Sequence, residues 1–459
     1  MADSKWSAQS TRLLEQTRQC CANYLQSLEQ RAVAPSAAAL AALERLDEPL
    51  PRASTAAEQT LALLDEIVSP ATMAMAGPRF FGFVIGGTLP AALAANWLSS
   101  AWDQNACFAS ATPGVARLEQ VALRWLIELF DLPAETTGGF VTGATVANFT
   151  ALAAARHAVL ARAGWNVESD GLFGAPPISV VVGEEVHPSL LKSLGLLGLG
   201  RSRIVRVPVD GQGRMCADRL PPIAGPTILC LQAGNVNTGA SDPFAALIDT
   251  AHRHGAWVHV DGAFGLWAKV SARHRALVDG VERADSWATD AHKWLNVPYD
   301  SGVALVRDPQ ALQAAMAVTA EYLPQPGAER NPCDYTPELS RRARGVEVWA
   351  ALRSLGSSGI EQLVRRNCAQ AREFAALLAA AGHEILNEVV LNQVLVAFGD
   401  AERTRRVVAA LQRDGTCWCG ITVWQGRTAM RISVSNWSTD DADVARSVAA
   451  MLRVAAAER

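Results

Sequence analysis

The sequence predicts an α/β protein in which a parallel or mixed sheet is covered by helices on both faces. Between residues 71 and 335, short β-branched runs alternate with segments of helical spacing, which is the pattern of such a sheet. The length of 459 residues, half of them hydrophobic, is enough for a large core and for more than one domain. The predicted strands are ISVVVG, SRIVRVPV, TILCLQAG, AWVHVDG and SGVALVR.

The flanking regions predict two further units. Residues 1–70 are polar and Ala-rich with helical spacing, interrupted by prolines around Leu50, and such an arm is expected to pack on a second copy of the chain. Residues 336–459 predict a small α+β domain, in which Ser438 and Asp441 are spaced as a capping box for a closing helix. Its other helix and its strands are expected at 359–381, 389–398 and 428–436.

Composition favours small-molecule chemistry. The net charge of −4 comes from interspersed charges, so the chain offers no basic stripe for nucleic acid or an acidic membrane. The N-terminus has no apolar signal segment, and no apolar run reaches the ~20 residues of a membrane span, which predicts a cytoplasmic protein. The nine cysteines are not spaced as C-x2-C pairs, so neither a metal site nor a disulfide framework is expected.

Two stretches offer groups for a ligand beside a predicted strand. In GGFVTGATVANFTAL, the small residues Gly143, Ala144 and Thr145 precede a helix, whose free N–H groups and dipole favour an anion. An ordinary helix entry remains open, because the glycine spacings of nucleotide-binding loops are absent. In SVVVGEEVHPSLL, His187 follows an apolar strand. It is suited to stack on a flat ligand, to transfer a proton, or simply to cap the next helix.

Two further stretches supply a carboxylate and an amine. In GAWVHVDGAFG, strand alternation puts His259 and Asp261 on one face, with Asp261 at the carboxyl end. A carboxylate buried there needs a cationic partner, so an internal ion pair is the alternative to a ligand contact. In TDAHKWLNVPYDSG, Lys293 has apolar neighbours, which disfavour its ammonium form and suit Schiff-base chemistry. The alternative is a surface lysine.

An anion site, an aromatic stacker, a carboxylate and an amine are together what pyridoxal phosphate (PLP) requires. Its phosphate, ring, pyridine nitrogen and aldehyde would take these four groups in turn.

These motifs resemble the group II PLP-dependent amino acid decarboxylases of the aspartate aminotransferase superfamily. HVDGAFG and DAHKWLNVPYDSG carry the resemblance, which extends from GPRFFGF to RISVSNW. It implies fold type I, with a mostly parallel seven-stranded sheet between helices and a small C-terminal domain. It also implies that Lys293 forms the Schiff base, that Asp261 pairs with the pyridine nitrogen, and that His187 stacks on the ring.

The resemblance assigns further residues. Ala144 and Thr145 would hold the phosphate, Ala263 would lie against the ring, and His292 would border phosphate and substrate. Asn235 or Thr238 would donate to the phenolic oxygen. Two positions depart from the family pattern: Gly262 replaces the usual alanine, and Asp290 stands where several relatives have asparagine near the phosphate. A carboxylate at position 290 would repel the phosphate unless it faces away. The substrate pocket would be lined by Phe81, Phe83 and Val84.

The activity implied is decarboxylation of an L-amino acid to its amine by a homodimeric enzyme. Another PLP reaction, aldol-type Cα–Cβ cleavage or transamination, stays open because fold and cofactor do not fix which bond breaks. A metal-dependent hydrolase using His259, Asp261 and His292 as ligands is a distant alternative. So is a relative without cofactor that serves only in binding.

Two more residues are candidates for the reaction. Residues 322–341 are rich in proline and predict a lid loop, with Tyr335 as proton donor just ahead of a helix expected near Pro337; a phenol that packs the loop down is the alternative. In TAMRISVSN, alternation puts Arg431 on the polar face of a strand, where it would bind a substrate carboxylate or form a structural ion pair.

Overall fold

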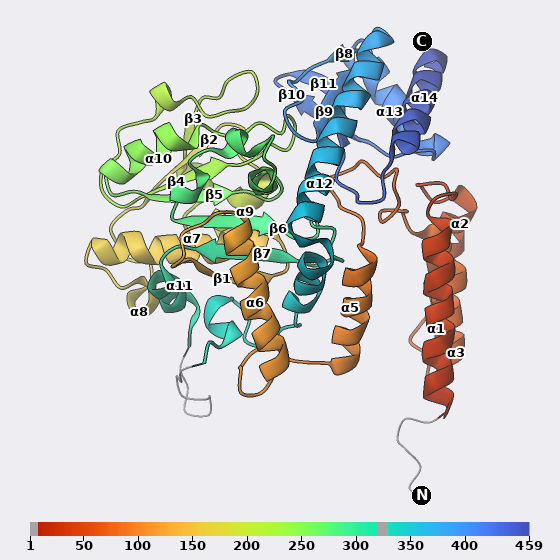
Figure 1. Ribbon diagram of the computed structural model, residues 1–459, viewed down its shortest axis with the longest axis horizontal. Coiled ribbons are helices and arrows are strands. Elements are labelled where there is room, and N and C mark those ends of the chain that lie inside the picture. The colour runs from red at the N-terminus through yellow and green to blue at the C-terminus, as the bar shows by residue number, and fades with distance from the viewer. Residues whose placement is uncertain (1–7, 319–328, 459) are drawn as a thin grey trace, which may run out of the picture.

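The computed structural model describes residues 8–318 and 329–458. Residues 322–328 of the predicted lid loop, including Tyr322, lie outside the described residues. Figure 1 shows a helical N-terminal arm, a large central sheet and a smaller C-terminal sheet, joined by the long helix α12 (Gly345–Ala380).

The central sheet has seven strands in the order β1-β7-β6-β5-β4-β2-β3, and every neighbouring pair is parallel except the two that involve β7. This confirms the predicted α/β class with a mostly parallel sheet. The strands are β1 (Thr137–Val141), β2 (Ser179–Gly183), β3 (Val205–Val207), β4 (Thr227–Gln232), β5 (Trp257–Asp261), β6 (Ser286–Asp290) and β7 (Gly302–Val306).

Both faces of this sheet are buried, which is why its strands are continuously apolar. Alternate residues of β2 enter different cores: Val181 belongs to a cluster with α6, α10 and α12, whereas Val180 and Val182 pack with α7, α9 and α11. The helices of this domain are α5 (Pro90–Trp102), α6 (Pro113–Leu129), α7 (Ala144–Arg162), α8 (Val167–Asp170), α9 (Pro188–Leu196), α10 (Phe244–Arg253) and α11 (Pro309–Met316).

The strands β1 and β6 were not predicted. Their sequences, TGGFV and SWATD, contain small and polar residues in place of β-branched runs, so the local pattern does not indicate a strand. Burial on both sides compensates, because all residues of both strands are buried.

The C-terminal domain contains a four-stranded antiparallel sheet in the order β10-β11-β9-β8. Helix α12 kinks at Gly356 (φ 61°), so the helix predicted from Gly359 is its second half, and the helix predicted near Pro337 begins only at Gly345. The capping box is formed by Asp440 and Asp443, two residues beyond the predicted pair. The elements are β8 (Glu384–Ile385), β9 (Gln393–Ala397), α13 (Ala401–Asp414), β10 (Gly420–Trp424), β11 (Arg427–Ser433) and α14 (Asp441–Ala457).

The N-terminal arm stands beside the body in Figure 1, with the long helix α1 (Ala8–Ser27) parallel to its edge. The predicted break is present, and Leu50 within it is 91% exposed. Its other helices are α2 (Ala37–Ala42), α3 (Ala57–Leu63) and α4 (Ser69–Ala71), with a π-helical turn at Leu64–Val68. Short 3-10 turns occur at Leu43–Leu46, Arg201–Arg203, Ala217–Arg219, Gly265–Val270, Arg275–Val278, Val281–Arg283 and Pro332–Tyr335.

No helix within residues 8–318 and 329–458 is long and apolar enough to cross a membrane. The domain boundaries at residues 70 and 335 stay predictions.

Candidate active site

The predicted site residues come from the carboxyl edge of the central sheet. Asp261 ends β5, Asp290 ends β6, and α7 begins three residues after the end of β1. Because β5, β6 and β1 all run in one direction, these ends meet at one edge of the sheet, as Figure 1 shows for the start of α7.

Asp290 connects three of these groups. Its Oδ1 accepts the backbone N–H of Ala144 at 2.6 Å and lies 3.4 Å from Nε2 of His292, and its Oδ2 lies 3.0 Å from Nζ of Lys293. The carboxylate therefore faces the start of α7. Lys293 is largely buried, and the next residue, Trp294, is fully packed in the core. The neighbours of Lys293 in the chain are thus apolar as predicted, but its amine faces a carboxylate, which favours the ammonium form.

The start of α7 is a narrow cradle. Gly143 precedes the helix in extended backbone, and a Cβ there would lie 3.0 Å from Cε1 of His292 and 3.4 Å from Oδ1 of Asp290. Glycine thus keeps the space between the helix start and His292 open. The helix that follows has 19 residues, so its first turn presents N–H groups and a positive dipole end to that space.

Asp261 is buried, and each of its oxygens has a neutral donor. Oδ1 accepts the N–H of Ala263 at 3.2 Å, and Oδ2 accepts Nδ2–H of Asn148 at 3.1 Å. The predicted cationic partner is absent among the described residues, where no ion pair involves Asp261. The glycine that departs from the family pattern has a steric reason: a Cβ on Gly262 would lie 2.8 Å from Cβ of Leu266.

His187 caps α9 and faces the same charges. Its Nδ1 accepts the N–H of Ser189 at 3.2 Å, so the neutral ring carries its proton on Nε2. Burial lowers the pKa of His187, and the charges of Asp261, Lys293, Arg431 and Asp290 also act on it. The imidazole is therefore neutral at pH 7 and lies near the other candidate residues. Its capping contact uses Nδ1 and leaves the face of the ring free for stacking.

Arg431 reaches this edge from β11 of the small domain. Its guanidinium donates to the carbonyl of Val236, which follows β4, at 3.4 Å. Burial lowers the pKa of Arg431, and no ion pair of this side chain is present in the described part of the chain. The structural ion pair that was the alternative is thus not found among the described residues, where this partly buried cation has no anionic partner.

Two aromatic rings flank Lys293. The ring of Tyr299 stacks on His292 with centroids 4.1 Å apart, and Nζ of Lys293 lies 6.0 Å from the ring centre of Phe264. Neither ring was predicted as part of the site; the signal was the position of Tyr299 in the stretch that contains Lys293.

The two candidate donors in the loop after β4 differ in whether a hydrogen is left for a ligand. The hydroxyl of Thr238 donates to the carbonyl of Gln212 at 2.7 Å and accepts the N–H of Ala240 at 3.2 Å, so it is used within the fold. Asn235 uses its oxygen to accept two loop N–H groups and gives one amide hydrogen to Gln232 at 3.3 Å. Its second amide hydrogen leaves Asn235 as the better donor.

The predicted pocket residues separate into buried and exposed positions. Phe81 packs edge-on against Phe374 in the small-domain core, with centroids 5.0 Å apart, and Val84 is fully buried in the main core. Both assignments are corrected, because neither side chain presents surface to a ligand. Phe83 is 56% exposed beside Trp418 and keeps the predicted role as a proposal.

Tyr335 lies elsewhere in the fold. Its hydroxyl accepts a hydrogen bond from Gln313 of α11 at 2.8 Å, and its ring lies 3.7 Å from the guanidinium of Arg330. It packs with Val306 and Leu312 between α11 and the sheet. The structure therefore does not bring Tyr335 to Lys293, Asp261 and His187, and its assignment as a catalytic residue is corrected to the packing alternative.

Together, the groups at the sheet edge fit PLP. Four groups meet there: a helix start suited to an anion, a carboxylate suited to a ring nitrogen, a neutral imidazole suited to a ring face, and an amine suited to an aldehyde. The metal alternative fits less well, because both ring nitrogens of His259 are engaged, by Asn148 at 2.8 Å and by Ser286 at 2.9 Å.

Residues 41–399 match the model of the pyridoxal-dependent decarboxylase conserved domain. The chain belongs to the pyridoxal-dependent decarboxylase family. It is a PLP-dependent carboxy-lyase that acts on an amino acid.

The similarity to members of this family extends along most of the chain. Tryptophan decarboxylase 1 of Oryza sativa is 29% identical over 90% of this chain and 87% of its own. L-2,4-diaminobutyrate decarboxylase of Rhizobium meliloti is 29% identical over 85% and 80%. The crystal structure of Oryza sativa TDC with PLP and tryptamine matches with a TM-score of 0.90 and 25% identity, covering 99% of both chains.

Asn148 is the functional candidate that the sequence analysis missed. It lies four residues into α7 and is fully buried between Asp261 and His259. An asparagine on the buried face of an Ala-rich helix was the available signal, because such an amide needs polar partners.

We expect Tyr335→Phe to keep the decarboxylation rate of this enzyme within about twofold. The change removes one neutral hydrogen bond, from Gln313, which costs about 1 kcal/mol of stability at most. Steady-state kinetics and thermal unfolding of the variant measure both effects. A large loss of kcat at unchanged unfolding temperature would return Tyr335 to the mechanism.

Proposed function

We propose that Lys293, Asp261 and His187 carry the decarboxylation of an L-amino acid in this enzyme. Bound PLP supplies an aldehyde that forms a Schiff base with an amine, and a protonated ring that accepts the electrons left when the bond from Cα to the carboxylate breaks. Lys293 provides the amine. Asp261 accepts a hydrogen bond from the protonated ring nitrogen of PLP, and the neutral imidazole of His187 covers one face of the PLP ring.

The remaining contacts follow from the same edge of the sheet. The first turn of α7, with Gly143 as its open start and the hydroxyl of Thr145, holds the phosphate; the N–H of Ala144 is engaged by Asp290. Ala263 lies against the second ring face, His292 borders the phosphate, and Asn235 donates to the phenolic oxygen.

The position of Lys293 is the observation that carries this proposal. Its amine lies 3.0 Å from Asp290, whose other oxygen holds the first N–H of α7. One carboxylate thus links the amine to the anion cradle, so a ligand with an aldehyde and a phosphate can reach both.

We also propose that Arg431 binds the carboxylate of the substrate. Two observations support it: the partly buried guanidinium has no anionic partner in the described residues, and its charge acts on His187. A cation desolvated in this way gains from a carboxylate ligand, and arginine forms two parallel hydrogen bonds with one.

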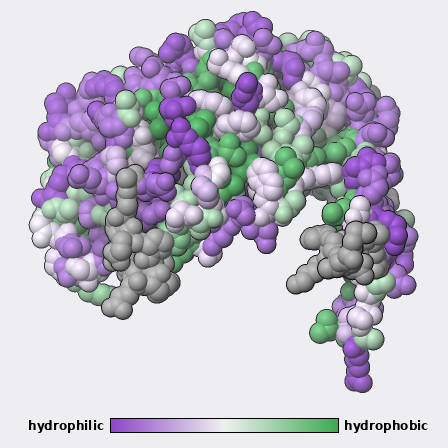
Figure 2. Space-filling model, turned by 60° about the horizontal axis from the view of Figure 1, so that its bottom comes forward, coloured by the Kyte–Doolittle hydropathy of each residue, from purple (hydrophilic) through white to green (hydrophobic). Residues whose placement is uncertain are grey.

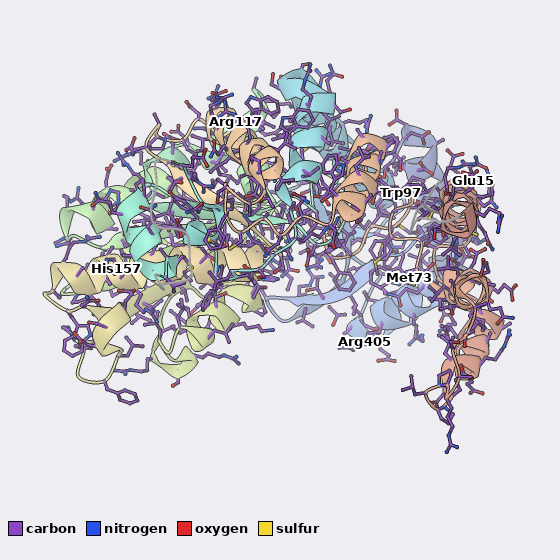
Figure 3. The ribbon with its side chains drawn as sticks, turned by 90° about the horizontal axis from the view of Figure 1, so that it is seen from below. Glu15, Met73, Trp97, Arg117, His157 and Arg405 are labelled. Atoms are coloured by element: carbon purple, nitrogen blue, oxygen red, sulfur yellow. The ribbon has the colours of Figure 1, made fainter. Side chains whose placement is uncertain are left out.

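We further propose that the enzyme is a homodimer in which the arm and α5 contact the second copy. Exposed apolar side chains support it, with Leu14 and Leu64 on the arm and Trp97 and Trp102 on α5 more than 40% exposed. Cavities of about 390 and 500 Å³ lie between arm and body, and Figure 2 shows the hollow between them. In Figure 3, Trp97 lies on α5 beside the arm. The cytoplasmic location stays a prediction from the sequence.

Lys293→Ala is expected to abolish amine and carbon dioxide formation, because among the described lysines it is the one placed at the carboxyl edge of the sheet. In the unmodified enzyme, borohydride should fix PLP on the peptide that contains Lys293, which mass spectrometry detects. Lys192→Ala, at an exposed position, is the control and should keep both properties. Attachment at a different lysine, or turnover without Lys293, would refute the proposed site; a keto acid or a cleaved aldehyde as product would refute decarboxylation.

Arg431→Met is expected to raise KM roughly 10- to 100-fold, the loss of a charge-assisted pair. It should not lower the unfolding temperature, because it leaves no buried carboxylate unpaired. The control is Arg427→Met on the same strand, whose exposed partner is Glu384. Unchanged KM in the Arg431 variant would show that this cation does not bind substrate.

Light scattering is expected to give twice the mass of one chain at micromolar concentration. Trp97→Glu should raise the dimer dissociation constant roughly 30-fold or more, because a buried aromatic anchor becomes a charge. Phe173→Glu, at a side chain that is 98% exposed, should leave it unchanged. A monomeric unmodified protein would rule out the homodimer.

A further inference from the structure

Five side chains that end at Asp261 form a continuous hydrogen-bonded chain. Nε1 of Trp257 donates to Oγ of Ser286 at 2.9 Å, and that hydroxyl lies 2.9 Å from Nδ1 of His259. Nε2 of His259 lies 2.8 Å from Oδ1 of Asn148, whose Nδ2 donates to Oδ2 of Asp261 at 3.1 Å. The chain joins β5, β6 and α7.

Chemistry fixes the direction of this chain from both ends. The indole of Trp257 can only donate, and the carboxylate of Asp261 can only accept. Asn148 must therefore turn its NH₂ to Asp261 and its oxygen to His259. His259 then donates from Nε2 and accepts at Nδ1 from the hydroxyl of Ser286.

Burial keeps His259 neutral, and its hydrogen-bond partners set the tautomer. The ring is fully buried, and burial lowers its pKa to about 3, so it carries no charge at neutral pH. Asn148 and Ser286 are also fully buried, and none of the five side chains has an unsatisfied polar atom. A complete buried network of this kind has one favoured arrangement.

We propose that Asn148 and His259 are positioning residues that set the orientation of the Asp261 carboxylate toward the ring nitrogen of PLP. This rests on the role proposed above for Asp261. Asn148 holds Oδ2, the N–H of Ala263 holds Oδ1 at 3.2 Å, and His259 fixes the rotamer of Asn148. The carboxylate plane is thereby set before the cofactor arrives.

A merely structural role predicts different behaviour. If the hydrogen-bonded network only fastens α7 to the sheet, interrupting it lowers stability and leaves each folded molecule with normal cofactor binding. If the network positions Asp261, interrupting it at His259 changes PLP affinity and the protonation of the ring nitrogen, although His259 makes no hydrogen bond to Asp261 in the described structure.

The test compares His259→Leu, Asn148→Leu and His259→Gln with the unmodified enzyme. Glutamine restores a donor near the position of Nε2, so it serves as the conservative rescue. Thr150→Val is the matched control, because it removes a buried hydrogen bond of α7, to the carbonyl of Val146. The measurements are the PLP dissociation constant on reconstitution, the ¹⁵N shift of labelled PLP, kcat and KM per bound cofactor, and thermal unfolding of the apoenzyme.

Both leucine variants are expected to raise the PLP dissociation constant and to lower kcat by roughly tenfold each, with KM nearly unchanged. The ¹⁵N shift should move toward the unprotonated ring. His259→Gln should recover most of the loss, and Thr150→Val should show none. Altered unfolding with normal affinity, ¹⁵N shift and kcat would overturn the proposal.

Two further variants make the outcome decisive. Ser286→Ala keeps His259 and is the milder cut if leucine prevents folding; an unchanged PLP dissociation constant in a folded Ser286→Ala enzyme would also overturn the proposal. Asp261→Ala tests the underlying assignment. If it leaves PLP affinity and the ¹⁵N shift unchanged, the proposed role of Asp261 fails; if it alone changes them, only the positioning role of Asn148 and His259 fails.

Discussion

The carboxylate of Asp290 is the contact on which the candidate site depends. It binds the first N–H of α7 through one oxygen and faces the amine of Lys293 through the other. Helix start and amine come from segments about 150 residues apart in the chain, and a buried carboxylate is costly unless hydrogen-bond donors or a cation compensate for the lost water. Asp290 therefore fixes the distance between the start of α7 and the amine of Lys293. A ligand that contacts both groups must span that distance.

The charges at this edge differ in how completely the protein satisfies them. Asp290 has a cation and an N–H, and Asp261 has two neutral donors. Within the described residues, the hydrogen-bond partner of Arg431 is a carbonyl. A site in which a partly buried guanidinium and an ordered carboxylate have no opposite charge among the described residues is suited to a ligand that carries both signs, which is the character of PLP joined to an amino acid.

The proposed PLP-binding residues and the exposed apolar side chains of the arm and α5 lie in different parts of the molecule. The groups proposed to hold PLP lie on strand ends and on α7, between two buried cores, which limits their movement. Several exposed apolar side chains lie on α5 and the arm, where Leu64 and Trp97 are about half exposed. The proposed contact with a second copy would cover these side chains without disturbing the fixed geometry of the site.

The sequence by itself determined the fold class and the strand that ends in Asp261, because alternation and β-branched runs are local properties. The apolar residues beside Lys293 did not indicate the carboxylate of Asp290 that faces its amine. It did not indicate β1 and β6, whose small and polar residues become strands only through burial on both faces. It also misplaced Tyr335 and Phe81, since a phenol in a loop and a phenylalanine beside glycine have no local signal for the core they join. Only the tertiary structure brought Asn148 to Asp261 and left Arg431 without an anion, because both depend on contacts between segments far apart in the chain.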